Sequence, residues 1–175
     1  MEYPYVVYYC EENVYRLALL RERAGSVAGS VVCISNESRE VALTGQRAGH
    51  GPAGLVVWDY HVIYVEDGFV YDLDSVLAVP SPYAEYRAAT FVGGWYREHE
   101  RYAPVFSVIA RADYLAAFSS DRSHMRDRDG SWRAPPPPWP PIYRPEAGNT
   151  LFALVDGVHP SVAWRGTALA FQSAP

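Results

Sequence analysis

The chain has 175 residues, of which 49% are hydrophobic and 20% charged, a composition typical of a globular protein that buries a full core. Its formal net charge of -5 argues against a phosphate-binding surface, so we expect no nucleic-acid partner. No apolar run approaches the length of a membrane span, and the first residues lack the basic stretch of a signal peptide. We therefore predict a single domain over residues 1–175, cytoplasmic and also compatible with the nucleus, monomeric and without membrane association.

All 15 basic residues are arginine, so mechanisms that depend on a lysine, such as Schiff-base or Walker-type chemistry, are excluded. The two cysteines, Cys10 and Cys33, are too few for a secreted disulfide framework, and we expect both to be reduced. Cys33 lies between Val32 and Ile34, which favours a buried hydrophobic role.

Cys10 stands immediately before the first predicted helix. Val14, Leu17 and Ala18 recur at helical spacing and predict a helix over about residues 12–23, which Gly25 ends. The N–H groups and dipole at a helix start stabilise a thiolate, so we expect a lowered pKa for Cys10 and a usable nucleophile.

The strands that follow carry a histidine and two carboxylates. The pattern predicts a buried strand at 30–35, a brief edge strand at 41–43, a loop at 45–54, a strand at 58–65 containing His61, and its hairpin partner at 69–74. Asp67-Gly68 is typical of a two-residue turn, which sets His61 opposite Asp74 and diagonal to Asp72 on the same face. The geometry predicts a His–Asp contact and leaves open which aspartate makes it.

The second half of the chain is less regular. The residues predict a break at 80–82, a weakly periodic helix within 83–99, a strand at 105–109, a helix at 112–118, a polar segment at 119–133, polyproline at 135–141, and a closing loop and strand at 164–171. This order favours an α+β fold in which the cysteine helix packs on an antiparallel sheet.

Several blocks of this sequence occur together, in the same order, in one known family. They are Tyr9-Cys10-Glu11-Glu12-Asn13, Ile34-Ser35-Asn36-Glu37, Trp58-Asp59-Tyr60-His61-Val62, Tyr71-Asp72-Leu73-Asp74 with Val76-Leu77, Arg111-Ala112-Asp113-Tyr114-Leu115, Ser120-Asp121-Arg122-Ser123-His124-Met125, and Trp132-Arg133 with Pro135 to Pro138. The chain resembles the protein N-terminal glutamine amidohydrolases.

The resemblance implies a papain/transglutaminase-like fold and a cofactor-free conversion of N-terminal glutamine to glutamate on proteins or peptides, a step that feeds an N-degron pathway. It also implies the roles of three residues: Cys10 as nucleophile, His61 as base and Asp72 as the carboxylate that orients His61. We expect the Cys10 N–H to be one oxyanion donor and the reaction to pass through a thioester.

Recognition of a free N-terminus requires a carboxylate for the substrate's α-ammonium group. Among the candidates we rank Asp59 and Asp121 first, ahead of Glu11 and Asp74, with Trp58 in the site wall. His124 lies in a polar loop, which it is expected to hold. The spacing of the cysteines and histidines does not match a zinc site, and we expect no metal.

Two other hypotheses about the function remain open. A thiol protease or transglutaminase relative would share Cys10 and His61 but cut or crosslink its substrate. A protein without catalytic activity would present residues 135–141 to a groove-binding partner. The same proline segment is also suited to form a rigid wall of an active site.

Overall fold

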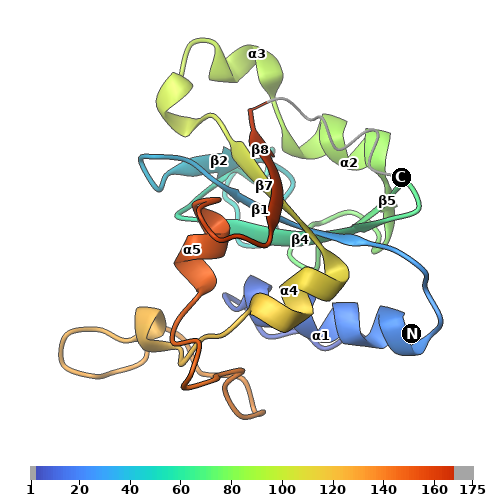
Figure 1. Ribbon diagram of the computed structural model, residues 1–175. Helices are drawn as coiled ribbons and strands as arrows, with labels where there is room; N and C mark the ends of the chain where they lie inside the picture. The colour runs from blue at the N-terminus through green and yellow to red at the C-terminus, as the bar shows by residue number, and fades with distance from the viewer. Residues whose placement is uncertain (1–2, 168–175) are drawn as a thin grey trace.

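The computed structural model describes residues 3–167, whose core is an antiparallel sheet of six strands in the order β6-β5-β4-β1-β7-β8. Figure 1 shows α1 and α4 on one face of this sheet and α2 on the other. The strands are β1 (Ser30–Ser35), β4 (His61–Glu66), β5 (Phe69–Tyr71), β6 (Ser81–Pro82), β7 (Val105–Ala110) and β8 (Val162–Gly166), and a separate pair is formed by β2 (Val41–Leu43) and β3 (Val56–Trp58). The helices are α1 (Cys10–Arg23), α2 (Tyr83–Thr90), α3 (Gly93–Tyr96), α4 (Arg111–Ala117) and α5 (Leu151–Val155), with short 3-10 turns at Glu100–Tyr102 and Ser123–Met125.

The continuous apolar run of β1 is explained by burial on both faces of the sheet. Val31 and Cys33 join the core beneath α1, α4 and α5, whereas Val32 and Ile34 join the core that contains Tyr86 of α2. Side chains alternate across a strand, so each face of β1 needs its own apolar set. The predicted α+β arrangement, with the cysteine helix packed on an antiparallel sheet, is confirmed.

The predicted two-residue turn and the register of the hairpin are also confirmed. Tyr64 pairs with Tyr71 and Val65 with Val70, the register that a two-residue turn produces. Asp67 and Gly68 both have positive φ, at 50° and 78°. The type I′ turn requires this backbone at both central positions, which is why Asp-Gly forms it readily.

Two boundaries of the predicted hairpin strands are wrong. The residues from 58 to 65 do not form one strand, because Trp58 ends β3 and His61 begins β4. The backbone leaves the sheet between them, where the Asp59 carbonyl accepts a hydrogen bond from the Ser35 hydroxyl at 2.6 Å. The partner strand ends at Tyr71, so Asp72 and Asp74 lie beyond the ladder.

The second half differs from the prediction in its helices. The expected helix within 83–99 divides into α2 and α3, because the chain becomes extended at Phe91 and the Gly93-Gly94 pair has low helix propensity. The predicted 112–118 helix is α4, displaced by one residue, and α5 was not predicted. β8 accounts for the start of the expected closing strand, and residues 168–171 lie outside the described part.

None of the helices in residues 3–167 combines the length and apolar character that crossing a membrane requires.

Candidate active site

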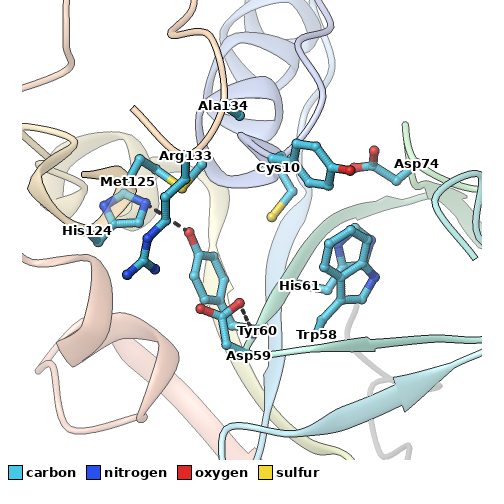
Figure 2. Close-up of a pocket in the computed structure, with 11 residues that line it drawn as sticks. Cys10, Trp58, Asp59, Tyr60, His61, Asp74, His124, Met125, Arg133 and Ala134 are labelled. Atoms are coloured by element: carbon cyan, nitrogen blue, oxygen red, sulfur yellow. Dashed lines mark hydrogen bonds between the residues drawn. The ribbon is translucent and has the colours of Figure 1, made fainter. Parts of the chain in front are cut away.

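A pocket of about 350 Å³ opens where the start of α1 meets the start of β4. Figure 2 shows the Cys10 sulfur pointing into it, with Tyr60 on one side and the rings of His61 and Trp58 on another. The lining residues are Tyr8, Cys10, Trp58, Asp59, Tyr60, His61, Asp74, His124, Met125, Arg133 and Ala134. Residues from five separate segments therefore form one cavity around a thiol.

Cys10 is the first residue of α1, two positions earlier than the predicted helix start. Tyr9 precedes it as the cap residue and makes no side-chain cap hydrogen bond, so the first-turn N–H groups have no side-chain acceptor there. Tyr8 has φ of 68°, a left-handed conformation that is strained for a tyrosine. The strained residue sets the direction from which the chain enters the helix beside the pocket.

The expected lowering of the Cys10 pKa is wrong for the free site. Burial raises the pKa of the Cys10 thiol well above its usual value, and the Glu11 and Asp74 carboxylates raise it further. The Val62 N–H opposes them but is outweighed. Burial and the neighbouring carboxylates therefore move the pKa of this thiol in the direction opposite to the one that its position at a helix start predicted.

His61 and Asp72 form a buried pair next to this thiol. The Nε2 atom of His61 lies 2.9 Å from Asp72 Oδ1, and the two residues are each 2% exposed. Burial alone lowers the pKa of His61, but the charge and hydrogen bond of Asp72 outweigh it, and the net pKa is raised. Because Nε2 is held by Asp72, Nδ1 is the ring nitrogen left for the thiol. The His–Asp contact predicted by the hairpin exists, and it uses the diagonal aspartate.

Asp72 is held by more donors than the sequence indicated. Gln46 Nε2 and Tyr86 Oη each donate to Asp72 Oδ2 at 2.9 Å, and the Asp74 N–H donates to Oδ1 at 3.0 Å. Burial raises the pKa of Asp72, but His61 and these side-chain hydrogen bonds outweigh it and lower the pKa. Sequence reasoning missed Gln46 and Tyr86, since one lies in an irregular loop and the other reads only as an apolar position of a helix.

A second polar group, which we call the pocket cluster, consists of Glu11, Tyr60 and His124. Glu11 is fully buried, and its Oε2 accepts from Tyr60 Oη at 3.1 Å and lies 3.7 Å from the Cys10 sulfur. Its Oε1 has no hydrogen-bond donor among the described residues, although His124 Nε2 is 3.4 Å away. His124 also lies 3.2 Å from Tyr60 Oη, so it belongs to the pocket wall rather than only to its loop.

A third group, which we call the glutamate clamp, consists of Glu12, Arg122 and Trp139. Arg122 Nε and Nη2 contact the two Glu12 carboxylate oxygens at 2.6 and 2.7 Å, and Trp139 Nε1 donates to Oε2 at 2.6 Å. Arg122 Nη2 also donates to the Trp139 carbonyl. The clamp fastens the proline segment to α1, while Ala134 at its start lines the pocket and accepts from Tyr9 Oη. This placement matches a rigid site wall.

The structure separates the carboxylates proposed for substrate binding. Asp59 and Asp74 line the pocket, and Asp59 is exposed at its rim whereas Asp74 is 4% exposed. Glu11 lies behind the lining. Asp121 is outside it, on the surface, where its carboxylate accepts from the Ser123 N–H at 2.8 Å. Trp58 stands in the wall with its ring nearly parallel to His61, at an interplanar angle of 15°.

Among the described residues, one group is compact enough to be considered as a metal site: His61, Asp72 and Asp74. One potential ligand atom from each lies within 4.8 Å of the others. Both Asp72 oxygens already accept hydrogen bonds, and Nε2 of His61 is engaged with Asp72. The arrangement favours an imidazole held by a carboxylate over cation ligation.

Thiol-dependent hydrolases combine a cysteine at a helix start with a histidine that a buried aspartate holds. The pocket of this α+β protein brings the same groups together. Comparison with known proteins identifies the family within this class. The model of the N-terminal glutamine amidase family matches residues 5–170, and the chain belongs to that family.

Curated relatives lead to the same family. Proteins of Drosophila mojavensis, Drosophila willistoni and Drosophila melanogaster, each named protein N-terminal glutamine amidohydrolase, are 43% identical over 148 residues. The match covers 79% of this chain and 71% of each relative. The resemblance drawn from the sequence blocks is therefore confirmed.

Proposed function

We propose that this protein hydrolyses the side-chain amide of an N-terminal glutamine on proteins or peptides, releasing ammonia and leaving glutamate. The observation that carries the proposal is the His61–Asp72 hydrogen bond beside the Cys10 sulfur, in a chain of the N-terminal glutamine amidase family. The cysteine helix packed on an antiparallel sheet that bears the histidine also supports a papain/transglutaminase-like fold.

In the first half of the reaction, His61 Nδ1 takes the thiol proton as the Cys10 sulfur attacks the carboxamide carbon. The raised pKa of the thiol fits this order, since the proton leaves with attack rather than before it. The Cys10 N–H donates to the oxyanion, a role supported by the absence of a side-chain cap at the start of α1. The imidazolium then protonates the departing nitrogen, and ammonia leaves a thioester on Cys10.

In the second half, His61 removes a proton from water, and the resulting hydroxide attacks the thioester carbon. The carbon–sulfur bond breaks, the sulfur regains its proton from His61, and the product is glutamate. Asp72 keeps Nε2 protonated and stabilises the imidazolium in both halves. The hydrogen bonds from Gln46 and Tyr86 keep Asp72 ionised for this task.

The test is ammonia release from a short peptide that begins with glutamine. We expect release from this peptide and none from its N-acetylated form, from a peptide with glutamine second, or from one that begins with asparagine, whose carboxamide is one methylene too short. Cys10→Ala should abolish release. Efficient deamidation of the acetylated or internal glutamine would instead identify a general glutaminase or a transglutaminase relative, and peptide-bond cleavage would identify a protease.

A further inference from the structure

The pocket is lined by two carboxylates in different surroundings. Asp59 lies at the rim, where it is exposed and its Oδ1 accepts from the Tyr60 N–H at 2.9 Å. Asp74 lies in the inner wall and is 4% exposed. A charge at the rim is solvated by water, whereas a charge in the wall needs a partner that the protein or a ligand must supply.

Within residues 3–167 the protein provides few partners that compensate the charge of the Asp74 carboxylate. The neighbouring Asp72 is ion-paired with His61, but Asp74 forms no ion pair there, and its carboxylate accepts from Tyr5 Oη at 2.7 Å. Arg47 is nearby, yet its Nε donates to the Ser75 carbonyl instead. Burial raises the pKa of Asp74, and the opposing effects of His61, Tyr5 and Arg47 do not overcome it.

The position of Asp74 relative to the reacting groups suits one part of the substrate. In glutamine the α-nitrogen is four bonds from the carboxamide carbon, a reach of about 5 Å when extended. One Asp74 carboxylate oxygen lies within 4.8 Å of a His61 ring nitrogen. A cation placed on Asp74 is therefore about as far from the His61 ring as the α-ammonium group of glutamine is from its own carboxamide. Asp74 and Cys10 line the same pocket, and the Asp74 carboxylate raises the pKa of the Cys10 thiol.

We propose that Asp74, positioned by the Tyr5 hydroxyl, receives the α-ammonium group of the substrate's N-terminal glutamine. This inference rests on the proposed function. Because Asp74 is buried in the pocket wall and not exposed at the rim, an acyl group or a preceding residue on the α-nitrogen would meet protein before it reached solvent. Acylation of the α-nitrogen also replaces a cation with a neutral amide, and the buried Asp74 carboxylate is then left without a counter-charge.

The experiment compares two peptides that differ only at the α-carbon, one beginning with glutamine and one beginning with its desamino analogue, in which hydrogen replaces the α-amino group. Ammonia release is measured for the original protein, for Asp74→Asn and for Asp59→Asn as the matched control. For Asp74→Asn we expect kcat/KM on the glutamine peptide to fall about 100-fold relative to kcat/KM on the analogue, mainly through KM, because the effect of Asp74 on the pKa of Cys10 is common to both peptides. Asp59→Asn should retain the preference for the amine.

An equal loss on both peptides in Asp74→Asn, or loss of the preference in Asp59→Asn, would overturn the assignment while leaving the proposed function intact. If the original protein released no ammonia from the glutamine peptide, the proposed function would fall instead, and the assignment with it. Asp74→Asn should also raise the thermal midpoint near neutral pH, because a carboxylate with a raised pKa destabilises the free protein there.

If Asp74→Asn does not fold, Tyr5→Phe provides the test. The Tyr5 hydrogen bond lowers the pKa of Asp74, so its loss raises that pKa, and the carboxylate becomes protonated at a higher pH. The acid limb of kcat/KM should then move to higher pH for the glutamine peptide and stay in place for the desamino analogue. If Tyr5→Phe left the acid limb of kcat/KM at the same pH for both peptides, the result would contradict the proposal.

Discussion

Glu11 and Glu12 are consecutive residues in the first turn of α1, both fully buried, and yet they lie in opposite surroundings. In the glutamate clamp, Glu12 receives the Arg122 guanidinium on both oxygens and the Trp139 indole on one. In the pocket cluster, Glu11 keeps one oxygen without a hydrogen-bond donor among the described residues and lies beside the Cys10 sulfur.

The difference separates two uses of buried charge. A carboxylate whose partners are complete holds chain segments together, since removing any partner leaves an uncompensated charge. A carboxylate whose partners are incomplete changes the electrostatics of its neighbours, as Glu11 does in raising the pKa of the Cys10 thiol. We expect substitutions around the pocket cluster to alter chemistry and substitutions in the glutamate clamp to alter stability.

The largest expected effect is on the pocket side. Cys10→Ala should lower kcat for ammonia release about 10⁴-fold or more, because the nucleophile is removed, while the urea midpoint stays close to that of the original protein. Cys33→Ala is the matched control: it removes a fully buried thiol from β1, and should keep the activity and lose about 1 kcal/mol of stability. Similar activity losses at the two positions would remove the distinction between the two thiols.

The next effect is on the clamp side. Arg122→Ala should lower the free energy of unfolding by about 3–5 kcal/mol, because Glu12 is left buried and unpaired. Asp127→Ala breaks the Arg133–Asp127 pair, whose side chains are more than half exposed, and should cost at most about 1 kcal/mol. Urea unfolding measures both. Equal losses in the free energy of unfolding would show that burial does not make the glutamate clamp more stabilising than an exposed ion pair.

The Asp72 network extends the comparison to a carboxylate that is both fully partnered and part of the site. Its lowered pKa contributes stability above the pKa of an unfolded aspartate, and this contribution is lost as pH falls through the folded pKa. Tyr86→Phe removes one donor, so it should cost about 1–2 kcal/mol near neutral pH and raise the folded pKa. Acid unfolding should therefore begin at a higher pH.

Tyr114→Phe is the control for that prediction, since its hydroxyl donates to the Glu11 carbonyl and not to a carboxylate. Its loss should lower the free energy of unfolding by the same amount across the acid range, and the pH at which stability begins to fall should stay unchanged. A shift of the same size in both variants would mean that Asp72 does not govern the acid limb.

The smallest effect concerns the charge of Glu11 itself. Glu11→Gln should lower the pKa of the Cys10 thiol, because a carboxylate that disfavours the thiolate is neutralised. The rate of alkylation by iodoacetamide against pH, in a Cys33→Ala background, would report the shift. Glu12→Gln should leave this titration unchanged, although it weakens the clamp. A thiol titration that responds to Glu12 and not to Glu11 would reverse the comparison.

Local signals in the sequence determined several elements of this protein. The spacing of Val14, Leu17 and Ala18 identified α1, and Asp67-Gly68 set the register of β4 and β5, because helix periodicity and turn backbone depend on neighbouring residues. The family blocks placed Cys10, His61 and Asp72 in one site, although the hairpin alone left Asp74 equally open.

The hairpin left open which aspartate meets His61, and the family resemblance implied Asp72. The tertiary structure shows how Asp72 makes the contact, since β5 ends at Tyr71 and the following turn directs Asp72 to the ring. It also decided that Glu11 and Glu12 differ, because their partners come from residues more than 45 positions away in the chain. Burial reversed the expected pKa shift of Cys10 for the same reason: desolvation depends on everything packed around the sulfur, and no local pattern encodes it.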